Sequence, residues 1–151
     1  MSREYTAEDI TWATRRLDIA MSRLMVAQSR AVGISVPEML ALEYLDADGS
    51  IGPSELARRL QMTSGAMTAL IDRLEESGHV VRKRHPADRR RVLVKRTKKA
   101  DEDLTAEIAP MAMQILELAE SLDDAARQAV GRFFEGFIAI IERTAAEACE
   151  R

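Results

Sequence analysis

The segment from Gly52 to Thr97 constrains the fold of this 151-residue chain more than any other. It opens with Pro53, a residue suited to the first position of a helix, and apolar residues at helical spacing then predict a short helix over 53–60. After a two-residue turn, Thr63 is placed to cap a second helix that runs from Ser64 to about Ser77. Gly78 then suits the left-handed end of that helix. The segment therefore begins with two helices at helix-turn-helix spacing.

The second helix has two unlike faces. One face is an apolar stripe, which we expect to pack on the core. It consists of Met67, Leu70, Ile71 and Leu74. The opposite side carries small, hydroxyl-bearing and charged residues: Ser64, Gly65, Thr68, Ala69, Asp72 and Arg73. Small residues allow a helix to enter the DNA major groove, which is about 12 Å wide, and to bring side chains to base edges. This face is our candidate for reading DNA.

A strongly basic ribbon follows the second helix. We expect a strand over His79–His85, an exposed tip over Pro86–Arg90 and a returning strand over Arg91–Arg96. Ten of the chain's 22 lysines and arginines lie between His79 and Lys99, against a single acid. The balance of +9 in a chain of net charge −3 means that the charge is segregated, and such a patch attracts phosphate.

A basic hairpin alone is more often a solvated surface than a nucleic-acid contact. Here it directly follows a two-helix unit of the right spacing, and that combination favours DNA binding.

The residues from Asp88 to Thr97, DRRRVLVKRT, resemble the wing signature of the multiple antibiotic resistance regulator (MarR) family. The upstream stretch Ile71–Glu75 with Gly78 is similar to that family's recognition-helix ending. Arg96 departs from the signature, because the family has leucine there, and Ala100 replaces a glycine that is often found in that place. The resemblance implies a mainly α fold with a small β-hairpin wing. It also implies a single MarR-like chain over 1–151, a winged helix-turn-helix lobe over 35–97, and dimerisation helices over 6–32 and 98–148.

The resemblance also implies residue roles. Arg90 would be the wing-tip arginine that enters the minor groove, where negative potential is concentrated, and Asp88 would orient the wing arginine. A turn role for Asp88 after Pro86 is the alternative, and the two are compatible. The full set of expected DNA-binding residues is Thr63, Ser64, Gly65, Thr68, Ala69, Arg73, Arg82, Lys83, Arg84, Arg89, Arg90 and Arg91.

The flanking segments read as long helices. Thr6 with Asp9, and Ser35 with Glu38, form capping patterns at two helix starts, and Thr97 is placed to cap the helix after the wing. The last helix, about 124–148, contains all three phenylalanines and is apolar on more than one face. Such a helix needs a second partner, and a second copy of the chain is the economical one. A two-fold dimer predicts an inverted-repeat operator in double-stranded DNA.

Composition narrows the remaining classes. The single cysteine, Cys149, excludes an internal disulfide and a cysteine-based zinc site, and it is consistent with a cytoplasmic protein. The sequence has no long apolar run, so we expect no membrane partner. The two histidines, His79 and His85, fall in the basic ribbon, where we interpret them as strand filler or phosphate neighbours. We expect no cofactor, no metal and no catalytic residue, and hence no enzyme.

Two questions stay open in the sequence. A non-specific architectural DNA-binding protein, or a protein-interaction module built on a winged helix, is the alternative to a sequence-specific regulator. Resemblance to the family also implies a small aromatic or anionic effector that relieves repression. Four residues are candidates to line its cleft, with core or dimer packing as their alternative: Trp12, Met39, Tyr44 and Met67.

Overall fold

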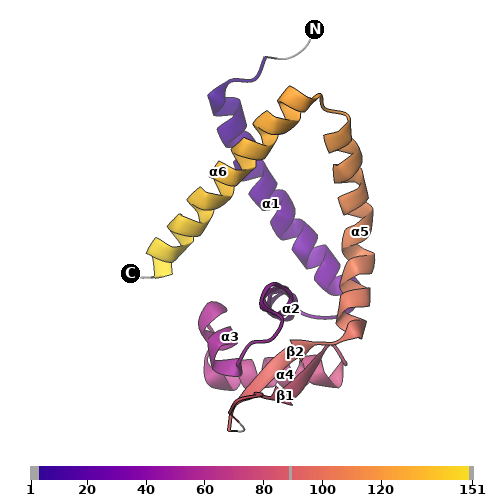
Figure 1. The fold of residues 1–151 in the computed structure, drawn as a ribbon, viewed down its shortest axis with the longest axis vertical. Helices are drawn as coiled ribbons and strands as arrows, with labels where there is room; N and C mark the ends of the chain where they lie inside the picture. Colours follow the sequence, from indigo (N-terminus) through magenta and orange to yellow (C-terminus); the bar gives the residue numbers. More distant parts are fainter. Residues whose placement is uncertain (1–3, 89, 150–151) are drawn as a thin grey trace. The chain divides into compact units, whose positions relative to one another are not determined.

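The computed structural model describes residues 4–88 and 90–149. The chain forms two compact units, Met1–Glu107 and Ile108–Arg151. Six helices and one two-stranded sheet make up the described residues, as Figure 1 shows. The expectation of a mainly α fold with a small β-hairpin is confirmed.

The first helix, α1 (Ala7–Val32), has both of its predicted ends. Thr6 Oγ1 accepts a hydrogen bond from the backbone N–H of Asp9 at 3.1 Å, and an Asp9 carboxylate oxygen accepts one from the Thr6 N–H at 3.0 Å. This reciprocal pair satisfies two N–H groups that have no partner inside the helix. Gly33 ends the helix at φ 79°, a left-handed conformation that glycine adopts without a steric cost.

The second helix, α2 (Val36–Asp48), begins with the other predicted capping box. The backbone N–H of Ser35 donates to a Glu38 carboxylate oxygen at 2.8 Å, and Pro37 occupies the first turn. Glu38 is buried, which is unusual for a carboxylate and requires partners for its oxygens.

The predicted helix-turn-helix is α3 (Pro53–Arg59) followed by α4 (Ser64–Glu76). Gln61, in the turn between them, has a positive φ of 52°. Thr63 Oγ1 accepts from the backbone N–H of Ala66 at 3.2 Å, so the predicted N-cap of α4 is confirmed.

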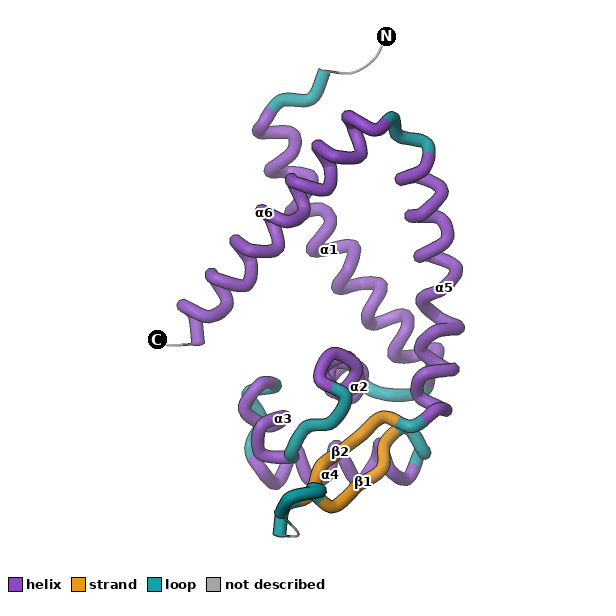
Figure 2. Tube along the Cα trace, in the orientation of Figure 1, coloured by secondary structure: helices purple, strands orange, loops and turns teal. Residues whose placement is uncertain are grey.

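The wing is a hairpin of β1 (Val80–Arg84) and β2 (Val92–Arg96), drawn as the two orange strands in Figure 2. The strands are antiparallel, and the five residues of each pair along their whole length. Ile51 adds a single antiparallel bridge to Val94. This bridge fixes the base of the wing to the loop before α3.

One hydrophobic core lies under α2, α3, α4 and the wing. All of the apolar stripe expected on α4 is in it, and none of those four side chains is more than 1% exposed. The larger core residues are Met39, Leu42, Leu45, Ile51, Leu56, Met67, Leu70, Ile71, Leu74, Val80, Val94 and Leu104. This core holds the recognition helix so that its polar side faces outward.

After the wing, α5 (Lys98–Glu120) starts in the first unit and ends in the second. Thr97 Oγ1 accepts from the backbone N–H of Ala100 at 3.2 Å, which confirms Thr97 as the cap. Ala100 is fully buried, so its methyl group fits where glycine is often found in the resembling family.

Arg96 takes the leucine position of the family signature in an unexpected way. Its side chain is only 11% exposed, and its two terminal nitrogens reach Asp46 of α2 at 2.8 Å and Asp101 of α5 at 2.6 Å. The departure from the signature is therefore accommodated by two carboxylates.

The second unit contains the end of α5 and α6 (Asp124–Cys149). Asp123 caps α6 by accepting from the backbone N–H of Ala126 at 2.7 Å, and Arg127 joins α6 to α5 by donating from Nε to the Ala119 carbonyl at 3.2 Å. The apolar residues of α6 remain exposed in the single chain: Val130, Phe133, Phe134, Ile138, Ile140 and Ile141 are 41–52% exposed.

Candidate nucleic-acid interface

The outer side of α4 is open and carries short side chains. Ser64, Gly65, Thr68 and Ala69 are all exposed, and Thr63 is exposed beside them. The Thr68 hydroxyl donates to the Ser64 carbonyl at 2.9 Å, so it presents its acceptor lone pairs and its methyl group to an approaching partner. The face that the sequence predicts to read bases is therefore accessible, and its role in reading DNA stays a prediction.

The wing carries free cations. Lys83 and Arg84 on β1, and Arg90 and Arg91 at the tip, are exposed. Within residues 4–88 and 90–149 none of their side chains forms an ion pair or hydrogen bond. Cations without an intramolecular partner remain available to phosphate. Arg89, which the sequence placed in the same set, lies outside the described residues.

Asp88 shapes the backbone of the wing tip. Its carboxylate accepts from the backbone N–H of Arg90 at 3.0 Å, and its carbonyl accepts from the N–H of Arg91 at the same distance. These bonds form a turn of the type that aspartate favours. The described contacts thus give Asp88 the turn role, which orients Arg90 through its backbone rather than through its guanidinium.

Arg82 and Arg73, both expected to meet DNA, are engaged within the protein. Arg82 pairs with Asp72 at 2.5 Å and with Glu75, so it links β1 to the outer side of α4. Arg73 Nε donates to a Glu38 carboxylate oxygen at 2.6 Å, although the arginine side chain is still 57% exposed. Both arginines hold the orientation of α4.

These contacts change the acidity of Glu38. Burial alone would raise its pKa, but hydrogen bonds from Ser35 and Arg73 outweigh burial, and the pKa lies below its ordinary value. The carboxylate is therefore charged at neutral pH and forms part of the support of the recognition helix.

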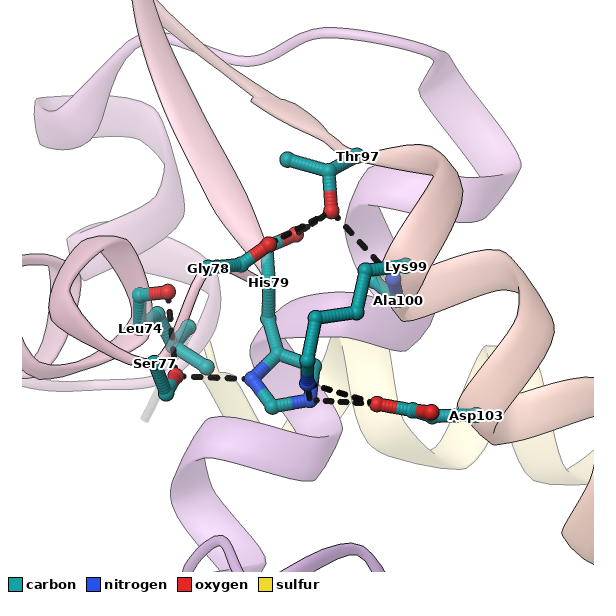
Figure 3. Close-up of polar contacts among 8 residues, drawn as sticks. All are labelled: Leu74, Ser77, Gly78, His79, Thr97, Lys99, Ala100 and Asp103. Carbon is teal, nitrogen blue, oxygen red and sulfur yellow. Dashed lines mark hydrogen bonds and ion pairs between the residues drawn. The ribbon is translucent and has the colours of Figure 1, made fainter.

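His79 is not a phosphate neighbour, one of the two roles that the sequence suggested for it, because its side chain is buried. It precedes β1, it is 2% exposed, and Figure 3 shows its ring between Ser77, Lys99 and Asp103. Ser77 Oγ lies 2.7 Å from His79 Nδ1, and Asp103 Oδ2 lies 3.1 Å from Nε2. No local sequence pattern predicts this cluster, because Asp103 is 24 residues from the histidine and lies on α5.

Lys99 and Leu74 complete the surroundings of the His79 ring. Lys99 Nζ, which can only donate, lies 3.0 Å from Nε2, and the Ser77 hydroxyl that contacts Nδ1 also lies 3.1 Å from the Leu74 carbonyl. Lys99 also donates to Asp103 at 2.7 Å, which holds the Asp103 pKa below its ordinary value. The buried ring thus joins the end of α4 to the start of α5.

A groove that the sequence did not reveal runs between the wing tip and the start of α3. Its lining residues are Gly52, Pro53, Ser54, Glu55, Arg58, Arg90, Arg91 and Val92. Hydrogen bonds from Arg58 and Arg59 lower the pKa of Glu55 to about 2. The groove places the free wing-tip arginines opposite α3.

The structure separates the four candidate effector residues. Met39 and Met67 are core residues, 3% and 1% exposed. Tyr44 lies under the guanidinium of Arg59, whose central carbon is 5.6 Å from the ring centroid. Trp12 is 67% exposed on α1. For the two methionines, the alternative of core packing therefore holds.

Comparison with known proteins agrees with this geometry. A model of the MarR family matches residues 34–92, which include α2, α3, α4 and β1. This segment of the chain, residues 34–92, is a MarR-family domain. The matched residues of this chain, 34–92, include the free wing cations and the open side of α4.

Relatives and solved structures extend the likeness. YcgE, a regulator of the HTH type from Bacillus subtilis, is 35% identical over 68 residues, which are 45% of this chain and 44% of that protein. The chain thus matches about half the length of its curated relatives. The crystal structure of RV1404 from Mycobacterium tuberculosis has a TM-score of 0.71 at 23% identity, and the likeness covers 92% of this chain and 97% of that one.

A mutant of S. aureus MepR, solved bound to an oligodeoxyribonucleotide, has a TM-score of 0.60 at 18% identity and covers 91% of this chain and 99% of its own. At these identities the two solved structures establish the winged-helix fold of this chain. No helix among the described residues is long and apolar enough to cross a membrane.

Proposed function

We propose that this chain is a sequence-specific DNA-binding transcriptional regulator that acts as a homodimer on an inverted-repeat operator. The observation that carries the proposal is the pairing of an open, small-residue face on α4 with unpaired cations on the adjacent wing. A helix face of this kind reads bases in the major groove, and the cations beside it bind the phosphates and the minor groove.

The family and the fold support the same reading. The curated relatives are named as transcriptional regulators, and one protein of the same fold was solved with an oligodeoxyribonucleotide. In this proposal, Arg90 and Arg91 at the wing tip bind the DNA backbone, while Thr68 and Ser64 on the exposed side of α4 contact bases.

The dimer proposal rests on the exposed apolar residues of the second unit. Phe133 and Phe134 are 41% and 42% exposed, which leaves large aromatic surfaces in water. Phe133 also stacks on Phe137, with 6.1 Å between ring centroids, so these two rings pack on one another within the single chain. A second copy would cover this side, and two recognition helices about 34 Å apart would then require an inverted repeat.

We also propose ligand-responsive repression, in which a small aromatic or anionic effector changes the spacing of the two recognition helices. A spacing error of a few ångströms loses contacts on both half-sites, so a modest change in the dimer is sufficient. The buried positions of Met39 and Met67 argue against assigning the effector to those two side chains.

The competing function is a non-specific architectural protein or an interaction module. The two are separated by the ratio of affinities for an inverted-repeat duplex, selected by the chain from a randomised pool, and for a scrambled duplex of equal length at one salt concentration. We expect a ratio of at least about 1,000, as is usual for specific binding, and a ratio near one favours the architectural function.

A further inference from the structure

Arg96 is the least exposed of the described cations between His79 and Lys99, and it is the one residue there that departs from the family signature. It is the last residue of β2, directly before the Thr97 cap of α5. Arg96 therefore lies where the wing ends and α5, the helix that leaves the DNA-binding lobe, begins.

The guanidinium of Arg96 has carboxylates on two different helices. Nη1 reaches Asp46 in the last turn of α2, and Nη2 reaches Asp101 in the first turn of α5. Both carboxylates are more than half exposed, whereas the arginine side chain is only 11% exposed, and Nε has no hydrogen-bond partner among the described residues. The largely enclosed charge therefore depends on these two contacts, and losing either one leaves it under-compensated.

A leucine in this place would fill space without fixing a direction. An arginine with two carboxylates adds ion pairs to two different helices, so it restrains how β2, α2 and α5 are oriented. The wing base is then held to the lobe at two points, the Ile51–Val94 backbone bridge and the Arg96 contacts.

We propose that Arg96 is a positioning residue for DNA binding: with Asp46 and Asp101 it sets the direction of the wing relative to α4 and locks the first turn of α5 to that arrangement. This inference rests on the proposed function for its consequence but not for its geometry. Arg96 itself meets no DNA, because its side chain is enclosed and both of its terminal nitrogens are engaged.

The test compares Arg96→Leu, which restores the family's residue, with Lys98→Leu, which removes the same charge from an exposed side chain two positions away. The probe is the inverted-repeat duplex that the wild-type chain selects from a randomised pool. We expect Arg96→Leu to fold with nearly wild-type thermal stability, since leucine removes the enclosed charge together with its need for partners, and both carboxylates stay exposed to water. We expect its affinity to fall by roughly 3- to 30-fold, the range found for residues that act through coupling.

The salt dependence separates positioning from phosphate contact. A positioning role leaves the slope of log affinity against log salt unchanged in Arg96→Leu, whereas loss of a phosphate contact lowers its magnitude by about 0.9. Arg96→Lys, which keeps the charge but cannot fork to two carboxylates, should recover only part of the affinity. Unchanged affinity in folded Arg96→Leu, a reduced salt slope, or an equal loss in Lys98→Leu would each overturn the proposal.

Two further measurements test the proposal if Arg96→Leu does not fold or if the wild-type chain selects no duplex. If Arg96→Leu fails to fold, Asp101→Asn removes one contact and should weaken binding in the same way, and wild-type affinity in that folded variant also overturns the proposal. Amide spectra of the DNA-free protein should show displaced resonances from Arg91 to Lys95 in Arg96→Leu and not in Lys98→Leu. If the wild-type chain selects no duplex, the proposed function fails, and these spectra still decide whether Arg96 orients the wing.

Discussion

The hydrogen bond between Arg73 Nε and Glu38 Oε1, at 2.6 Å, joins the recognition helix to the first turn of α2 across 35 residues of sequence. The Glu38 side chain is 7% exposed, and its other oxygen accepts from the backbone N–H of Ser35. One carboxylate therefore caps α2 and holds α4.

Glu38→Ala should destabilise the protein by roughly 1–3 kcal/mol, because it removes both the capping bond and the partner of Arg73. The pKa of Glu38 is lowered by folding, so its contribution is complete above its unfolded value of 4.5 and is lost as the pH falls through the folded value. Urea unfolding at neutral pH and in acid measures this, and the variant and the wild type should converge in acid. Glu76→Ala, at an exposed acid of α4, is the control and should change little. A stability difference that persists below the folded pKa would assign the effect to packing.

Local signals in the sequence were enough to predict the helix boundaries. Thr6 with Asp9, Ser35 with Glu38, and Thr63 each cap the helix that their spacing predicted, since a cap depends on residues three positions apart. The strands were placed within a residue or two for the same reason, as hairpin pairing is local.

Long-range polar partners were beyond such reasoning. His79 was placed in the ribbon, and its burial against Asp103 depends on how α5 packs after the wing. Arg82 and Arg73 were counted as DNA contacts because the sequence shows their charge but not the carboxylates that fold against them. The sequence alone does not distinguish an unpaired cation from one that pairs with a distant carboxylate.

Arg90→Ala should weaken binding to the selected duplex by about 1–3 kcal/mol and reduce the salt slope by about one, because Arg90 is an unpaired cation at the wing tip. Titrations at several salt concentrations measure both quantities. Lys98→Ala removes the same charge from a cation that is paired with Glu102, and it should have a smaller effect. Wild-type affinity in Arg90→Ala would exclude the wing tip from DNA recognition.

Thr68→Ala should change which base is preferred at one position of each half-site, by about 1–3 kcal/mol, because the hydroxyl presents an acceptor and the methyl group presents an apolar contact. Repeating the selection from a randomised pool with the variant measures the preference. Thr11→Ala is a matched control, since that hydroxyl makes the same kind of bond to the Ala7 carbonyl on α1. An equal loss of affinity on every sequence would contradict base reading by this face.

Phe134→Asp should disrupt self-association. Phe134 is 42% exposed and packs edge-on against Phe133, with 5.8 Å between ring centroids, so an aspartate there puts a charge into the apolar side of α6 that we propose to be covered by the second copy. An unpaired charge inside such an interface costs several kcal/mol, which is sufficient to shift the chain to monomer at micromolar concentration. Sedimentation velocity measures the mass, and circular dichroism shows whether the helices persist. Arg132→Asp places the same residue at another exposed position of α6 and should leave the association intact if the aromatic side is the interface.

Because the two halves of an inverted repeat are bound separately by monomers, Phe134→Asp should also lose affinity for the full operator while binding a single half-site as the wild type does. A monomeric variant with full operator affinity would show that recognition does not depend on the dimer.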